Sequence, residues 1–252
     1  MKMYDLICVV PVYNEEKIVP RAIPMLLRFL QDAQAKGSIK VVIADNGSTD
    51  GTARASRQLL KKYSKMLAYE YIDKKGRGNA LKSVLSLYKA KIYLYIDVDL
   101  PCEPQDIQRL IEGIEAGNDL VISRRIGGRP LLRRIMTFGL RYINYFVFRM
   151  MFSDVQCSVK ALSAQAAALL KESCEQDGWY LDTELVVLSH QSNFVILETP
   201  ITWVETRFSD RQSKVHPLRD IVQGTHALVA IKRNALRMKR HNLMLVSEDK
   251  TT

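Results

Sequence analysis

The chain has 252 residues, of which 47% are hydrophobic and 25% are charged, and its formal net charge is +10 at pH 7. This balance excludes a disordered chain, and the length suffices to bury the core of one α/β domain. The four cysteines show no Cys-x-x-Cys spacing, which favours reduced thiols of a cytoplasmic protein.

Strand and helix patterns alternate through the first half of the chain. Runs of apolar and β-branched residues predict strands, and apolar residues at helical spacing predict helices. This alternation predicts the α/β class, with a mostly parallel central sheet and helices on both faces. Ligands of such sheets bind at the carboxyl ends of the strands. In chain order the predicted elements are strand 6–10, helix 18–34, strand 40–44, helix 49–64, strand 67–72, helix 80–89, strand 92–96, helix 103–116 and strand 120–123.

Neither a signal peptide nor a membrane-spanning segment is expected. Asp5 interrupts the short segment before the first strand, which excludes the apolar stretch of a signal peptide. The most apolar segment, 143–152, contains Arg149 and falls well below the roughly 18 residues that a span requires.

Two carboxylates, Asp97 and Asp99, stand at the end of the apolar run Tyr93-Leu94-Tyr95-Ile96. Positions i and i+2 of a strand face the same way, so both side chains converge on one point if the extended geometry continues. Hard oxygen donors in this place suit Mg²⁺ or Mn²⁺, and such a cation suits a diphosphate. A solvated turn between the strand and Pro101 is the alternative interpretation.

Two further loops follow predicted strands and carry polar side chains to the same edge. Their sequences are Pro-Val-Tyr-Asn-Glu-Glu over 11–16 and Asp-Asn-Gly-Ser-Thr-Asp-Gly-Thr over 45–52. Asp45 can accept hydrogen bonds from an imide or a ribose, and the Asn-Gly pair that follows it permits a tight turn. Alternatively, Ser48 and Thr49 serve only to cap the next helix.

Taken in chain order, at 11–16, 45–52 and 97–99, these three motifs resemble those of the family 2 glycosyltransferases of GT-A fold. Within that family the chain is similar to the dolichyl-phosphate glucosyl- and mannosyltransferases and their bacterial polyprenyl-phosphate relatives. The resemblance covers residues 5–235. Five later segments carry the narrower likeness: KGRGNAL at 75–81, SRR at 123–125, DVQCSVK at 154–160, LDTEL at 181–185 and SKV at 213–215.

The resemblance implies roles for residues on the donor side. Asp97 and Asp99 would hold the Mg²⁺ or Mn²⁺ that bridges to the diphosphate of a nucleotide sugar, with Asp99 also a catalytic residue. Lys75 or Arg77 would touch the sugar or the diphosphate, although either could equally be a solvated loop cation. The residues that match the cradle of the base and ribose are Pro11, Tyr13, Glu15 and Asp45.

The acceptor side requires cations more than a base, if the acceptor is a lipid phosphate. A hydroxyl acceptor needs a general base, whereas a monophosphate, whose second pKa is about 6, is already anionic near neutral pH. Arg124, Arg129 and Lys214 are the candidate phosphate ligands. Asp154 matches an acid near the acceptor in relatives, as a catalytic base or orienting residue, or it is a helix N-cap.

Two other acids, Asp182 and Glu184, lie in one of the matching segments. We expect them to be structural carboxylates that pair with arginines rather than catalytic residues.

A basic, amphipathic segment points to a membrane surface. From Arg124 to Ser153 the chain contains no acid, and a helix is predicted over 131–152. Its polar side carries Arg134, Thr137, Arg141, Asn144 and Arg149, whereas apolar and aromatic residues fill much of the rest. Such a helix suits an anionic membrane interface, although a helix packed on the sheet with a solvated basic edge is the alternative. The arginines of the segment are at positions 124, 125, 129, 133, 134, 141 and 149.

A second helix with a basic end is predicted over 217–240. We expect one domain over 1–240, with a nucleotide-sugar-binding half over 1–123 and an acceptor half over 124–240, and a flexible tail over 241–252. Some relatives carry C-terminal transmembrane helices, and no such helix is predicted here. The basic, amphipathic helix and the reduced thiols favour a cytoplasmic location, peripheral on the inner face of a membrane.

Three hypotheses for the function follow. The first is an inverting, metal-dependent hexosyltransferase that uses a UDP- or GDP-hexose and a polyprenyl or dolichyl phosphate. The second is a soluble member of the same family with a polysaccharide or small-molecule acceptor and an essential carboxylate base. The third is a basic nucleotide- or nucleic-acid-binding module, but the sequence has no recognisable nucleic-acid-binding motif, so no nucleic-acid partner is expected.

Overall fold

The structure is a computed structural model that describes the chain except residues 1, 34, 128–130, 206, 209–216 and 249–252. Two of the predicted phosphate ligands, Arg129 and Lys214, therefore lie outside the described residues. The same holds for the Ser-Lys-Val segment at 213–215.

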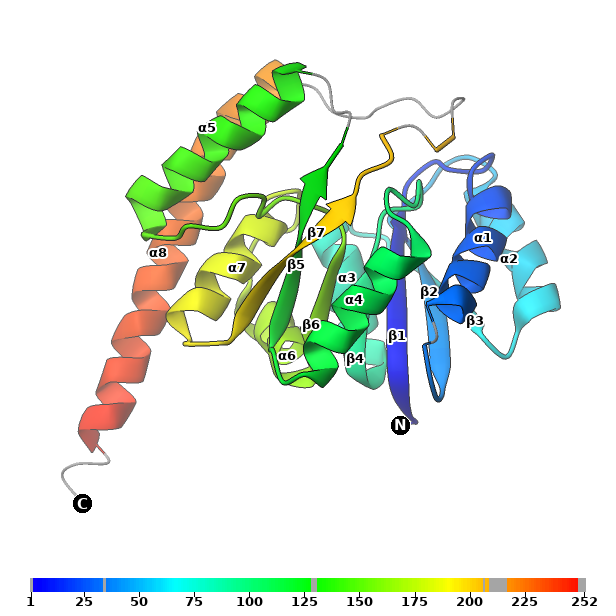
Figure 1. Cartoon of the computed structure of the whole chain (residues 1–252), viewed down its shortest axis with the longest axis horizontal. Coiled ribbons are helices and arrows are strands. Elements are labelled where there is room, and N and C mark those ends of the chain that lie inside the picture. Colours follow the sequence, from blue (N-terminus) through cyan, green and yellow to red (C-terminus); the bar gives the residue numbers. More distant parts are fainter. Residues whose placement is uncertain (1, 34, 128–130, 206, 209–216, 249–252) are drawn as a thin grey trace.

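A seven-stranded sheet, in the order β3-β2-β1-β4-β6-β5-β7, forms the centre of the described chain (Figure 1). Neighbouring strands run parallel except at β6, which is antiparallel to both β4 and β5. The predicted mostly parallel sheet is thus confirmed. The strands are β1 (Met3–Val12), β2 (Ile39–Asp45), β3 (Leu67–Tyr71), β4 (Lys89–Tyr95), β5 (Leu120–Ile126), β6 (Lys160–Ser163) and β7 (Ile196–Thr202).

Helices cover both faces of this sheet, as predicted. Alternate residues of β1 point to opposite faces, so Leu6 and Cys8 enter one hydrophobic core while Ile7 and Val9 enter the other. Helices α1 and α4 pack in the first core, and α3, α6 and α7 pack in the second. The helices are α1 (Val19–Asp32), α2 (Thr52–Tyr63), α3 (Arg77–Leu87), α4 (Pro104–Glu115), α5 (Leu131–Phe148), α6 (Ala164–Ser173), α7 (Leu181–Gln191) and α8 (Pro217–Glu248).

Helices α5 and α8 lie at one end of the molecule (Figure 1). The predicted helix 131–152 is four residues too long, because α5 ends at Phe148 and Arg149 takes a left-handed φ of 58°. Asn144, which was expected on the polar side, is buried at 1% exposure. Helix α8 continues to Glu248, so the expected flexible tail begins inside this helix.

No helix in the described part of the chain is both long and apolar enough to span a membrane. The four cysteines are buried and unpaired, in agreement with the prediction of free thiols. Burial raises the pKa of the Cys157 thiol to about 12, which makes it a poor nucleophile.

Candidate functional site

The loops that follow β1 and β2 are locked together by hydrogen bonds. The backbone N–H of Asn14 donates to Ser48 Oγ at 2.9 Å, and that of Glu15 donates to Thr52 Oγ1 at 2.8 Å. In return, the N–H of Thr49 donates to Asn14 Oδ1 at 2.8 Å. The alternative that Ser48 and Thr49 cap a helix is wrong, since α2 begins at Thr52 with Gly51 as its N-cap and no side-chain cap bond. The two motifs instead build one surface.

Asp45 is fully buried beneath this surface. Its Oδ1 accepts from the N–H of Ser48 at 2.9 Å, and its Oδ2 accepts from the Tyr69 hydroxyl at 2.7 Å. Burial, followed by this bond to Asp45, raises the pKa of Tyr69. The next residue, Asn46, accepts from the N–H of Gly76 at 2.7 Å and so ties the β2 loop to the start of α3. Asp45 therefore holds the loops in place, and its contact with a base or ribose stays a prediction.

Lys75 lies with Tyr13 at the predicted nucleoside end of the site. The exposed Lys75 Nζ is 3.4 Å from the Tyr13 hydroxyl and 5.4 Å from the centroid of its ring. Pro11 and Tyr13 are half-buried, whereas Glu15 is buried at 5% exposure. The structure thus brings Lys75 to the ring of Tyr13, one of the residues predicted to cradle the base and ribose.

The carboxylates Asp97 and Asp99 stand in a turn rather than in a continued strand. Strand β4 ends at Tyr95, and the N–H of Leu100 donates to the carbonyl of Asp97 at 3.0 Å. Leu100 takes a left-handed φ of 48°, so the extended geometry on which the same-side argument depended ends before the motif. Both carboxylates remain half-buried at the carboxyl end of β4.

This pair suits a cation that is shared with a substrate. Among the described residues, no group of three or more His, Cys, Asp or Glu side chains could hold a metal ion. Two carboxylates are nevertheless the protein ligands that Mg²⁺ uses when phosphate oxygens and waters complete its shell. The donor set therefore fits a Mg²⁺ or Mn²⁺ ion bound together with a diphosphate.

Arg77, the first residue of α3, joins the Asp97 turn to α7. Its guanidinium is buried at 7% exposure, with Nε 3.4 Å from Asp97 Oδ1 and Nη1 donating to Asp182 Oδ2. The guanidinium carbon also lies 5.3 Å from the Tyr95 ring centroid and 5.7 Å from that of Trp179. Burial alone would lower the pKa of Arg77, but the charges of Asp182 and Asp97 raise it above its usual range. Arg77 is therefore a charged part of the site, not a solvated loop cation.

The prediction that Asp182 pairs with an arginine is confirmed, whereas Glu184 makes its contacts within the described residues with an asparagine side chain and a backbone N–H. The Glu184 carboxylate accepts from Asn234 Nδ2 at 2.8 Å and from the N–H of Gln176 at 2.7 Å. Burial raises the pKa of Glu184. Glu184 therefore joins α7 to α8 and to the loop before α7.

On the acceptor side, Asp154 is held by an arginine that the prediction passed over. Arg125 donates from Nε and Nη2 to the two Asp154 oxygens at 2.6 Å each, and the two side chains are 13% and 5% exposed. Asp154 does not cap a helix, because a short turn follows it. The neighbouring Arg124, at the carboxyl end of β5, is exposed and open to an acceptor. Its role as a phosphate ligand stays a prediction.

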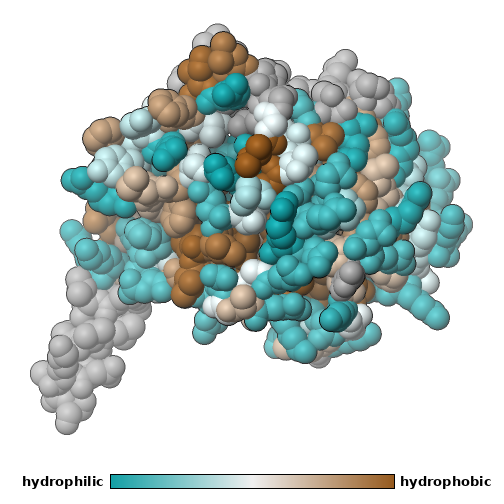
Figure 2. Space-filling view, viewed as in Figure 1, coloured by the Kyte–Doolittle hydropathy of each residue, from teal (hydrophilic) through white to brown (hydrophobic). Residues whose placement is uncertain are grey.

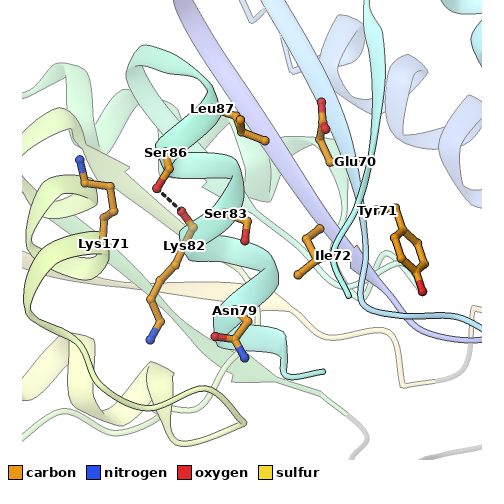
Figure 3. A pocket seen from close by; sticks show the side chains of 9 residues that line it. All are labelled: Glu70, Tyr71, Ile72, Asn79, Lys82, Ser83, Ser86, Leu87 and Lys171. Atoms are coloured by element: carbon orange, nitrogen blue, oxygen red, sulfur yellow. Dashed lines mark hydrogen bonds between the residues drawn. The ribbon is translucent and has the colours of Figure 1, made fainter. Parts of the chain in front are cut away.

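A pocket of about 460 Å³ lies between the end of β3 and α3 (Figure 3). Its wall on α3 runs from Asn79, near the start of the helix, to Leu87 at its end. None of the predicted site residues lines it, so this pocket is separate from the Asp97 turn. Its lining residues are Glu70, Tyr71, Ile72, Asn79, Lys82, Ser83, Ser86, Leu87 and Lys171.

The exposed surface of α5 is apolar and basic. Arg134 and Arg141 are exposed beside large hydrophobic side chains that the fold leaves in contact with solvent. Figure 2 shows hydrophobic side chains gathered at the end of the molecule where α5 begins. The exposed hydrophobic residues of this helix are Leu131 (69%), Ile135 (57%), Phe138 (57%), Tyr142 (48%), Ile143 (43%), Tyr145 (39%) and Phe146 (68%).

Three residues that hold the site were not singled out from the sequence. Arg207 donates to the carbonyls of Leu100 and Cys102 at 2.7 and 3.0 Å, and so fixes the end of the Asp97 turn. Lys160 and Tyr95 both contact Asp182. Lys160 closes the Asp154 segment of the family likeness and Tyr95 stands in the apolar run before Asp97, but neither position indicated a contact with Asp182.

Comparison with known proteins identifies the family. The sequence model described as Glycosyl transferase family 2 matches residues 7–178. Glycosyltransferase AglD of Haloferax volcanii is 24% identical over 220 residues, which are 85% of this chain but only 35% of AglD. The dolichyl-phosphate beta-glucosyltransferase of Dictyostelium discoideum is 25% identical over 241 residues, which are 89% of this chain and 72% of that protein.

Solved structures confirm the predicted GT-A fold. Glucosyl-3-phosphoglycerate synthase from Mycobacterium tuberculosis, in complex with Mn²⁺, UDP and glucosyl-3-phosphoglycerate, superposes with a TM-score of 0.65. The superposition covers 92% of this chain and 80% of that one at 17% sequence identity, so it shows a shared fold.

Proposed function

Because this chain belongs to glycosyl transferase family 2, we propose that it transfers a hexose from a nucleoside-diphosphate sugar to a polyprenyl phosphate. The observation that carries the donor half of the proposal is the meeting of the Asp97 turn with a buried, charged arginine at the carboxyl end of the sheet. The relatives named for transfer to dolichyl phosphate support the acceptor half.

On the donor side, Asp97 and Asp99 would hold Mg²⁺ or Mn²⁺, which supplies positive charge against the departing diphosphate. Arg77 is the better candidate than Lys75 for contact with diphosphate oxygens. It lies 3.4 Å from Asp97, and its Nη2 is buried without a hydrogen-bond partner among the described residues. Lys75, beside Tyr13, would instead meet the nucleoside, together with the base and ribose cradle predicted around Asp45.

On the acceptor side, the reaction is a single displacement. An oxygen of the acceptor phosphate forms a bond to the anomeric carbon while the bond from that carbon to the donor diphosphate breaks. The bonding electron pair leaves with the nucleoside diphosphate, and the configuration inverts. No proton has to be removed, because the attacking oxygen is already anionic. The bidentate ion pair between Arg125 and Asp154 supports a reaction that does not require this acid as a base.

The acceptor would be held by cations near the α5 surface. Arg124 is exposed at the end of β5, and Arg129 and Lys214 remain candidates by sequence alone. The exposed aromatic and aliphatic residues of α5, with Arg134 and Arg141 among them, suit the interface of an anionic membrane. In this proposal the enzyme works as one domain with a donor half and an acceptor half, peripheral on the cytoplasmic face of a membrane.

The test of the donor site is the variant Asp99→Asn, compared with Asp32→Asn at an exposed position at the end of α1. Binding of UDP and GDP is titrated with and without Mn²⁺, and hexose transfer is measured. We expect Asp99→Asn to lose turnover and metal-dependent nucleotide binding, whereas Asp32→Asn keeps both. Full activity of Asp99→Asn would remove this motif from the proposed site.

A further inference from the structure

The Asp182 carboxylate is the meeting point of four elements of the fold. Its Oδ1 accepts from Lys160 Nζ at 2.6 Å and from the Tyr95 hydroxyl at 2.5 Å, and its Oδ2 accepts from Arg77 Nη1. These residues come from α7, β6, β4 and α3, respectively. Asp182 is 1% exposed and Lys160 is 0% exposed, so the cluster is closed to water on the Lys160 side.

The sheet itself brings Lys160 and Tyr95 together. They are paired residues of the antiparallel strands β4 and β6, so their side chains stand on the same face. That face is the one on which α7 packs, and it presents both donors to a single oxygen of Asp182. Lys160 Nζ also donates to the carbonyl of Cys157.

Stability alone does not account for this buried lysine. Taking an ammonium and a carboxylate out of water costs about as much as their attraction returns, and apolar residues of similar volume often stabilise such a site more. The charges point to another role. Arg77 and Lys160 together carry two positive charges, and Asp182 carries one negative charge. Asp97 supplies the second negative charge, so the four side chains are neutral together.

The geometry shows how this balance controls Arg77. Lys160 and Tyr95 occupy Oδ1 of Asp182, which leaves only Oδ2 for the guanidinium. Asp182 therefore cannot form a bidentate ion pair with Arg77, although this is the common arrangement of an arginine with a carboxylate. The guanidinium keeps its Nε toward Asp97 and retains an Nη2 without a hydrogen-bond partner in the described chain.

We propose that Lys160, assisted by Tyr95, is a positioning residue for the cation-and-diphosphate site, because it keeps Arg77 shared between Asp182 and Asp97. The inference rests on the proposed function and names residues to which that function assigns no role. Lys160 contacts neither substrate nor cation. It acts through Asp182 and Arg77 on the carboxylate that would hold the cation.

The unmodified chain is first tested with UDP and with GDP, and the nucleotide that binds more tightly is used for all variants. Its dissociation constant is measured without and with Mn²⁺. The ratio of the constant without Mn²⁺ to the constant with Mn²⁺ reports the cation-dependent part of binding. A variant that is only less stable has fewer active molecules but the same ratio. The variants are Lys160→Met, Lys160→Arg and Tyr95→Phe. Lys82→Met is the matched control, since Lys82 also bonds an aspartate and a carbonyl, at Asp177 and Cys174.

We expect Lys160→Met to reduce the ratio about tenfold or more, the loss that follows when a charge-assisted hydrogen bond is removed. Tyr95→Phe, which removes one oxygen and keeps the ring, should reduce the ratio in the same direction by a smaller factor. It carries the test if Lys160→Met does not fold. Lys160→Arg should recover part of the ratio, and Lys82→Met should keep all of it.

Two results would overturn the proposal, and they differ in what else they remove. An unchanged ratio in Tyr95→Phe, and in Lys160→Met if it folds, would refute the role of Lys160 and leave the proposed function standing. A parent chain that binds neither nucleotide more tightly with Mn²⁺ would refute the proposed donor site, and the positioning role with it.

Discussion

The ion pair between Arg125 and Asp154 permits a direct test of whether Asp154 is a structural acid or a catalytic base. Asp154→Asn keeps the shape of the side chain but leaves the Arg125 guanidinium, 13% exposed, without its counter-charge. Removing one partner of a buried ion pair costs about 3–5 kcal/mol, and we expect about 3 kcal/mol because Arg125 also lies over the Trp203 ring. For a chain of this length, that loss lowers Tm by roughly 6–12 °C.

Thermal unfolding followed by circular dichroism measures the shift, and a transfer assay with a short polyprenyl phosphate measures kcat. Asp177→Asn is the control, because Asp177 is 36% exposed and its pairs with Lys74 and Lys82 should contribute at most about 1 kcal/mol. Arg125→Met combined with Asp154→Asn should be more stable than Asp154→Asn alone, since no charge is then stranded.

We expect the folded Asp154→Asn protein to retain most of its kcat with the phosphate acceptor. A Tm within about 1 °C of the parent, together with a kcat that falls by about 100-fold or more, would refute this reasoning. Asp154 would then be a general base, and an acceptor that attacks through a hydroxyl would become the better hypothesis.

Three further predictions follow from the acceptor side and the buried cluster. The double variant Phe138→Ser with Phe146→Ser should lower the affinity for anionic vesicles, measured by co-sedimentation, about tenfold or more. Leu87→Ser is the control, because Leu87 is 50% exposed on α3, and it should keep the parent's affinity. Equal affinity of all three proteins would refute a lipid-facing α5. Arg124→Ala should raise KM for the phosphate acceptor and leave nucleotide affinity unchanged, and unaltered acceptor kinetics would make this arginine structural. Burial acts to raise the pKa of Asp182, but the charges of Arg77 and Lys160 lower this pKa below the usual 3.8. The ionised Asp182 carboxylate therefore contributes its full stabilisation above that pH, and the stabilisation is lost as the pH falls further. Acid unfolding monitored by fluorescence should therefore depend less on pH below about 4 in Asp182→Asn, and an identical acid profile would contradict the assigned pairing.

The first half of the fold was predictable because its strands are continuous apolar runs with helices of regular spacing between them. The sequence patterns did not predict the two strands and two helices that directly follow α5, which are β6, α6, α7 and β7. β6 opens on the fully buried Lys160, a residue that breaks any hydrophobic pattern. In α7, buried Asp182, Thr183 and Glu184 stand beside apolar residues, so the helix has no polar side by which to recognise it.

The site was predictable in its motifs but not in its contacts. The sequence placed Asp97 and Asp99 at the end of a strand, whereas the turn that begins at Asp97 depends on Leu100 adopting a left-handed conformation. Arg77 was one of two candidate loop cations, and only its partner Asp182, 105 positions away along the chain, distinguishes it from Lys75. Contacts over such separations follow from the packing of the sheet and helices, which a local pattern does not encode.

The measurement that tests the central claim most directly is a screen of donors for transfer. The purified protein, with Mg²⁺ or Mn²⁺, is given UDP-glucose, GDP-mannose and related donors, each with and without a short polyprenyl phosphate, and nucleoside diphosphate release is followed. The account predicts release that depends on the lipid phosphate, from a donor that thereby names the sugar, with an inverted linkage in the product. Release that ignores the lipid phosphate but responds to a soluble hydroxyl acceptor would contradict it.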